Sequence, residues 1–280
     1  MKWQGRRGSR NIEDRRGSGA KAAGIGGVGV LVVLAIGLFT GVDVTAFLEG
    51  QGGVASGGGV ELTEADRQEG AFVSVTLADT EEVWSALFKA QLGQPYTPVT
   101  LVLYKGVTQS ACGGASGATG PFYCPGDKKV YLDTGFFTTL TRQLGARGDF
   151  AAAYVVAHEV AHHVQDELGI LSQANRLRAQ VSEAESNAIS VRIELQADCL
   201  SGIWARHVEE RFGTLEQGDL EEAVNAARQI GDDTLQRNAG RVPMPHTFTH
   251  GTSAQRARWF GEGYEAGDMR VCDTFSTDDL

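Results

Sequence analysis

The stretch from Ala157 to Gln165 contains two histidines four residues apart, His158 and His162, with Glu159 directly after the first. Residues four apart share one face of a helix, so both imidazoles can bind the same ion. Neutral imidazole suits zinc, and a catalytic zinc takes three protein ligands and leaves a fourth position for water. Glu159 is then placed to accept a proton from that water. The H-E-x-x-H pattern therefore predicts a hydrolytic zinc site.

The residues around the pattern favour this interpretation over an ordinary amphipathic helix that happens to carry two histidines. Val160 and Ala161 are uncharged, and the surrounding helix is apolar enough to be buried. A third histidine, His163, falls on a different face of the helix. We expect His163 to lie behind the metal ligands or in solvent, without binding the metal.

The third ligand is expected from a polar helical run over residues 173–210. Glu194 and Asp198 are four apart in this run and share a face, and apolar neighbours indicate that this part is buried. Because an unpaired buried carboxylate is costly, we assign Glu194 to the metal and Asp198 to the other ring nitrogen of His158. The alternative is that both carboxylates are solvated. The rival metal ligands are then Glu183, Glu185, Glu209 and Glu210.

Hydrolysis of a peptide also needs a donor for the oxyanion that develops beside the metal. An irregular loop over residues 240–253 contains two histidines and leads into a predicted last helix over 253–265. His250 is our candidate for the donor, and His246 is the second choice. The competing interpretation is that His250 only caps or packs the last helix. Arg256 stays unassigned, because it could bind a substrate carbonyl or a structural carboxylate.

Four segments carry a resemblance to a known family: Lys2 to Gly17, Ala157 to Gln165, Glu194 to Cys199, and Thr249 to Arg256. By these segments the chain resembles the bacterial neutral zinc metallopeptidases. The resemblance implies a membrane-tethered zinc peptidase with a His-His-Glu site, broadly similar to the thermolysin-like zincins. It also implies that an edge strand beside the zinc helix binds an extended substrate, for which we nominate residues 130–133 unless they form an ordinary sheet strand.

The charge is distributed unevenly along the 280 residues. The formal net charge is −10, yet residues 1–21 hold seven basic side chains against two acidic ones, so the rest of the chain is strongly acidic. An acidic body argues against nucleic acid as a partner. The hydrophobic content of 42% is enough for one good-sized core, and nothing indicates a second catalytic domain.

Residues 22–42 carry no charged side chain. About 20 apolar residues span a bilayer as a helix, and a basic flank stays in the cytoplasm. We therefore expect a basic cytoplasmic head over 1–21, a single-pass membrane anchor over 22–42 and an extracytoplasmic zinc domain. A cleaved signal peptide is the competing interpretation, with a small-residue site at Val44-Thr45-Ala46, although the long charged head argues against it.

Four cysteines agree with an oxidising compartment. Cys112 and Cys124 bracket a loop rich in glycine and serine, which leaves Cys199 with Cys272. Four cysteines allow three pairings, however, and the sequence does not choose among them. The absence of a C-x-x-C motif argues against a cysteine zinc site.

The remaining patterns divide the chain into a glycine-rich linker over 43–59 and a folded domain over 60–280. Within that domain we expect a helix that begins at Asp79 or Thr80 and a zinc helix from Asp149 to about Leu168. The other expected elements are strands over 99–104 and 129–133 and a helix over 215–230.

We therefore expect an α+β, zincin-like domain with a small sheet packed on the H-E-x-x-H helix, acting as a Zn2+-dependent peptidase on peptide or protein substrates. A second hypothesis is a membrane-anchored scaffold with a structural zinc, in which a residue such as His246 or His250 closes the fourth position. A third hypothesis is a metal-dependent amidase that acts on the cell wall.

Overall fold

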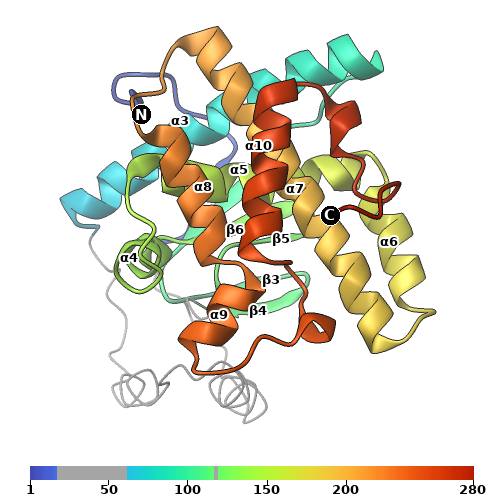
Figure 1. Ribbon diagram of the computed structural model, residues 1–280. Helices are drawn as coiled ribbons and strands as arrows, with labels where there is room; N and C mark the ends of the chain where they lie inside the picture. The colour runs from blue at the N-terminus through green and yellow to red at the C-terminus, as the bar shows by residue number, and fades with distance from the viewer. Residues whose placement is uncertain (18–61, 117–118) are drawn as a thin grey trace.

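The computed structural model describes residues 1–17, 62–116 and 119–280. The fold is α+β, as predicted, with helices packed around two small sheets (Figure 1). The predicted linker over 43–59 and the predicted anchor over 22–42 lie outside these ranges. Among the helices formed by the described residues, none is both long and apolar enough to cross a membrane.

The main sheet has four strands in the order β1 (Ile12–Asp14), β2 (Thr100–Tyr104), β6 (Lys129–Asp133) and β5 (Phe122–Cys124). β2 is parallel to both β1 and β6, while β5 is antiparallel to β6. Residues 101–103 of β2 are at most 1% exposed, as expected for an apolar strand that is covered on both faces. The second sheet pairs β3 (Val107–Ser110) with β4 (Gly113–Ser116).

The prediction that residues 130–133 form the edge strand is wrong. These residues belong to β6, where Val130 pairs with Leu101 of β2 on one side and with Tyr123 of β5 on the other. Both backbone edges of β6 are therefore occupied, so it cannot accept an added strand. The strand at this end of the sheet is β5.

The helices are α3 (Glu64–Leu87), α4 (Gly135–Arg142), α5 (Asp149–Glu167), α6 (Ile170–Arg178), α7 (Glu183–Phe212), α8 (Asp219–Gln229), α9 (Asp232–Asn238) and α10 (Ser253–Ala266). Shorter turns of other helix types cover Phe88–Leu92, Pro245–Thr247 and Met269–Cys272. The helix of the H-E-x-x-H pattern, α5, packs against α3, α6, α7 and α8 and against β5 and β6 (Figure 1). The predicted metal-binding helix is therefore central to the fold.

Two helix starts differ from the predicted ones, and capping explains both. α3 begins at Glu64, well before the predicted start, because Thr63 and Asp66 form a reciprocal capping box. The predicted run over 173–210 is divided into α6 and α7, since Ser182 and Glu185 form a second capping box that starts α7.

Residues 1–17 are part of the folded domain, which differs from the separate head that we expected. They supply β1, and the ammonium of Met1 lies 2.6 Å from Asp149 Oδ1 at the start of α5 and 3.3 Å from Asp219 Oδ2. Arg6 donates two hydrogen bonds to Asp79 of α3, at 2.5 and 2.8 Å. Arg6 and Arg7, two of the basic side chains that were expected to flank a membrane, thus pair with Asp79 and Glu82 of α3. The folded domain therefore includes residues well before residue 60.

A close crossing of α7 and α10 aligns the residues behind the predicted metal site. A Cβ atom at Gly202 would lie 2.0 Å from Phe260 O, and one at Gly263 would lie 1.9 Å from Cys199 O, so glycine is required at both positions. Disulfides join Cys199 to Cys272 and Cys112 to Cys124, one of the three pairings that the sequence left open.

Candidate metal centre

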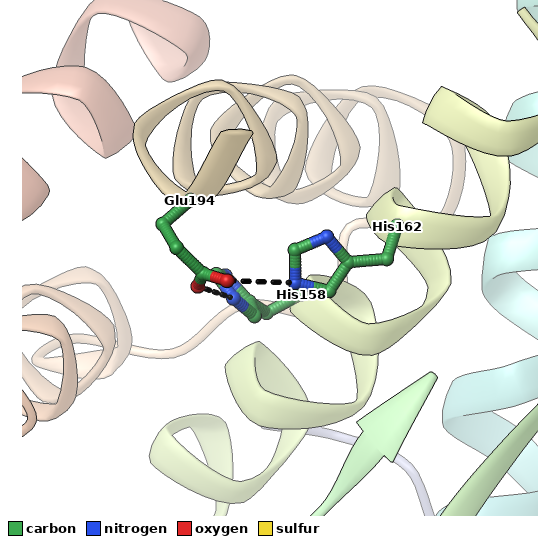
Figure 2. A group of neighbouring side chains, drawn as sticks. All are labelled: His158, His162 and Glu194. Atoms are coloured by element: carbon green, nitrogen blue, oxygen red, sulfur yellow. Dashed lines mark hydrogen bonds and ion pairs between the residues drawn. The ribbon is translucent and has the colours of Figure 1, made fainter. Parts of the chain in front are cut away.

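The structure brings together the three residues that the sequence assigned to the metal. His158 and His162 project from one face of α5 toward Glu194 on α7 (Figure 2). His158 Nε2 lies 3.1 Å from Glu194 Oε2, and His162 Nε2 lies 3.6 Å from Glu194 Oε1. One donor atom from each residue lies within 4.8 Å of the other two. Two imidazoles and one carboxylate from two packed helices therefore converge on one point.

Both imidazoles are held in the tautomer that a metal requires. His158 Nδ1 lies 2.9 Å from Asp198 Oδ1, and His162 Nδ1 lies 2.8 Å from Gln165 Oε1. The amide of Gln165 has a fixed orientation, because its Nε2 donates to the carbonyl of Ile193 at 2.8 Å. Because both neighbouring oxygens can only accept a hydrogen bond, each Nδ1 is the nitrogen that would carry the hydrogen in the neutral ring, and each Nε2 would be left to bind a metal. This donor set fits zinc.

Asp198 lies behind His158, as predicted, within a buried ion pair. Asp198 is 0% exposed and Arg256 is 1% exposed, and the guanidinium donates to both carboxylate oxygens, at 2.8 and 3.0 Å. Tyr154 donates a third hydrogen bond to Asp198 at 2.5 Å. Burial raises the pKa of Asp198, but the charges of Arg256 and His158 outweigh burial and bring this pKa below its ordinary value. Arg256 therefore binds a structural carboxylate, which is one of the two roles that the sequence left open.

Glu159 is buried beside the converging donors, with 8% of its surface exposed. Burial raises the pKa of its carboxyl group, although the neighbouring His162 and His158 lower it. Glu159 is thus the buried carboxylate nearest in sequence to the converging donors.

A cavity of about 310 Å³ lies in front of His162 and Glu194. Its other walls come from the end of β5, from α6, and from the loop before α10, which contribute Tyr123, Leu171 and His250. The volume is at the lower end of the range for ligand pockets. His162 and Glu194 are thus reached from a small, open cavity between helices and the sheet end.

His250 lines this cavity, while its side chain is 49% exposed. Its backbone N–H donates to Asp232 Oδ2 at 2.6 Å, and its Nδ1 lies 3.3 Å from Asp232 Oδ1. Burial lowers the pKa of His250, but the hydrogen bond to Asp232 and the charge of Glu194 give a net rise. His250 does not cap the last helix, since Thr252 does so through Gln255. His246 does not line this cavity within the described part of the chain.

A family profile with the description "Putative neutral zinc metallopeptidase" matches residues 1–275. The chain belongs to this family. It is 44% identical to the uncharacterized protein YpfJ of Escherichia coli (strain K12), over 98% of this chain and 99% of that protein. It is 41% identical to the uncharacterized protein Rv2575 of Mycobacterium tuberculosis (strain H37Rv), over 78% of this chain and 74% of that protein. No solved structure matches the chain.

Sequence reasoning missed two residues at the candidate metal centre, Gln165 and Tyr123. Gln165 is three residues after His162 on the same helix, a spacing that could have predicted the contact. Tyr123 comes from a strand and has no comparable local signal. His163 is buried and does not face the metal donors, because its Nε2 lies 2.8 Å from Thr97 O.

Proposed function

We propose that this protein is a zinc-dependent peptidase. The observation that carries the proposal is the convergence of His158, His162 and Glu194 on one point, with the buried carboxylate of Glu159 beside them. The family to which the chain belongs supports the same activity. Metal-dependent hydrolysis of a peptide bond uses a metal-binding set of this kind and a carboxylate that can move a proton.

His158, His162 and Glu194 would hold the zinc ion, which supplies Lewis-acid activation of a water and of the substrate carbonyl when it is bound. Glu159 accepts a proton from the attacking water and delivers it to the leaving amine. His250 donates a hydrogen bond to the oxyanion that develops on the substrate. Asp198 and Gln165 keep the two imidazoles in place during these steps.

The sheet supports binding of an extended substrate. β5 is the last strand at its end of the main sheet, and Tyr123 of β5 and the following Pro125 line the cavity. A peptide that adds to β5 as a further strand would therefore run beside the metal donors. This assigns to β5 the role that the sequence analysis gave to residues 130–133.

A structural zinc is the less favoured alternative. Structural zinc sites are closed by four protein ligands. Among the described residues, the group around His158 contains three donors, and neither His246 nor His250 belongs to it. This arrangement supports a site that leaves one position for the reaction.

We further propose that the protein acts outside the cytoplasm and contacts the membrane through residues 22–42. Two disulfides support an oxidising compartment. The expected cytoplasmic head is replaced in this proposal, because β1 is hydrogen-bonded to β2 of the zinc domain. Residues 1–17 therefore lie on the same side of the membrane as the zinc domain.

The test is hydrolysis by the full oxidised chain loaded with zinc, compared with its Glu159→Gln variant on a mixture of quenched fluorescent peptides. The variant is expected to keep one zinc and to lose hydrolysis by a factor of about 10² or more. Glu183→Gln, an exposed change at the start of α7, is the matched control and should cleave as the unmodified chain does. Cleavage by Glu159→Gln at the unmodified rate would contradict the mechanism.

A further inference from the structure

The cavity beside the metal donors has a wall formed by one face of α6. Leu171, Asn175 and Arg178 all line it. Their spacing of four and then three residues places them on the same side of the helix. The last of these residues, Arg178, also ends the helix. A guanidinium is therefore held at the rim of the space in which a substrate would lie.

The charges that line the cavity are unusual for so acidic a protein. Of the side chains that the structure places in its wall, Glu194 supplies the one carboxylate, and the proposed metal uses it. Arg178 carries the permanent positive charge, since a guanidinium does not lose its proton in proteins. Away from the metal, the cavity thus offers a cation without an opposing anion.

The hydrogen bonds of Arg178 go to neutral oxygens. Its Nε donates to Ser186 Oγ and its Nη1 donates to Asn175 Oδ1, each at 3.3 Å, which is longer than most hydrogen bonds of this type. Within the described ranges, no carboxylate lies at ion-pair distance from Arg178. By contrast, Arg256 bonds both oxygens of Asp198. The half-buried Arg178 therefore has donors left for a ligand.

We propose that Arg178 binds a carboxylate of the substrate, so that the cavity selects peptides with an acidic side chain or a free carboxyl terminus beside the cleaved bond. The planar guanidinium forms two parallel hydrogen bonds with a carboxylate, which an amide cannot match. The proposal rests on the peptidase function and names the class of substrate that this peptidase cleaves.

The first experiment compares kcat/KM for paired peptides on the full zinc-loaded chain. One set carries Glu or Gln at each of three positions on either side of the cleaved bond, and a second set ends in a free acid or an amide. The unmodified chain should prefer the acid about tenfold or more at one position. A preference for the internal Glu identifies a side chain as the ligand, and a preference confined to the free acid identifies the carboxyl terminus.

Variants decide whether Arg178 causes this preference. Arg178→Gln should lower the ratio of kcat/KM for the acid peptide to that for the amide peptide to about 1. Arg178→Lys should keep part of the preference, because lysine keeps the positive charge but cannot form the two parallel hydrogen bonds of a guanidinium. Arg176→Gln is the matched control, since Arg176 is exposed on the same helix and does not line the cavity. An acid preference that survives in Arg178→Gln would overturn the proposal, as would a ratio of about 1 at every position in the unmodified chain.

A binding experiment separates this proposal from the peptidase function. If no peptide is cleaved, the peptidase proposal fails, while the affinities of the same Glu and Gln peptides for the zinc-loaded chain still test Arg178. Fluorescence anisotropy should give a Kd about tenfold lower for the acidic peptide, with the difference lost in Arg178→Gln and kept in Arg176→Gln. Equal Kd values for the two peptides would overturn the proposal.

Discussion

The amide oxygen of Gln165 lies 2.8 Å from Nδ1 of His162, three residues earlier on α5. The same amide donates to Gln196 Oε1 at 3.0 Å, and Gln196 donates to the carbonyl of Cys272 at 2.8 Å. The orientation of His162 is thereby tied to α7 and to the C-terminal segment. Partners of this kind commonly change metal affinity by large factors when they are removed.

Gln165→Ala should therefore lower zinc affinity by about 10- to 100-fold while leaving all three predicted ligands in place. Competition with a chelator of known affinity measures the effect. Gln173→Ala, at an exposed position of α6, serves as the control. An unchanged zinc affinity in Gln165→Ala would show that the hydrogen bond does not position His162.

The ion pair between Arg256 and Asp198 should matter far more for stability than a nearby exposed pair. Arg256→Met leaves the carboxylate of Asp198 buried without its partner, which typically costs about 3–5 kcal/mol. Arg258→Met, two residues along the same helix, breaks a pair with Asp279 whose side chains are 41% and 82% exposed, and should cost far less because solvent screens the pair. Urea unfolding of both variants makes the comparison, and equal losses would refute it.

The parts of the site that were predictable depend on local spacing. His158, Glu159 and His162 follow from helix periodicity, and Asp198 follows from its position four residues after Glu194. The bounds of α5 were predicted to within a residue, and Gly169 marks its end. Asp149 does not cap the helix as expected, because it is the first helical residue and Gly148 precedes it without a side-chain cap.

The parts that were not predictable depend on contacts between distant segments. Ile12 pairs with Leu101, and Arg6 pairs with Asp79, so the role of the N-terminal basic residues is set by partners without a local signal. The order of β6 and β5 in the sheet likewise depends on which strands pair. The residues of β6 alone cannot reveal that both edges of this strand are occupied.

Stability should fall as the pH rises above about 8, because of the ammonium of Met1. Burial lowers the pKa of this ammonium, but the hydrogen bond and charge of Asp149 outweigh burial and raise the pKa above its ordinary value of 8.0. Its contribution to stability is therefore fully present below pH 8.0 and is lost as the pH passes the higher pKa of the folded state. Urea unfolding at about pH 7 to 10 should show this loss of stability in the chain whose Met1 amino group is unmodified. A chain acetylated at Met1 lacks the group, so an identical pH dependence in both would contradict the prediction.

The position of β1 gives a prediction about topology. Single cysteines introduced at two exposed sites, Arg10→Cys and Glu183→Cys, should react alike with a membrane-impermeant maleimide on intact cells. The unmodified chain is the control, and it should not react because its four cysteines are paired in disulfides. Labelling of Glu183→Cys without Arg10→Cys would place the two segments on opposite sides of a membrane and would contradict the pairing of β1 with β2.

The central claim is an open zinc site formed by His158, His162 and Glu194. The measurement that tests it most directly is the metal content of the full oxidised chain, together with the coordination of that metal by X-ray absorption. We predict one zinc bound by two imidazoles and one carboxylate, with no fourth protein ligand, and a sharp loss of zinc in Glu194→Ala. An absence of zinc, full zinc content in Glu194→Ala, or a fourth protein ligand such as His250 would contradict the account.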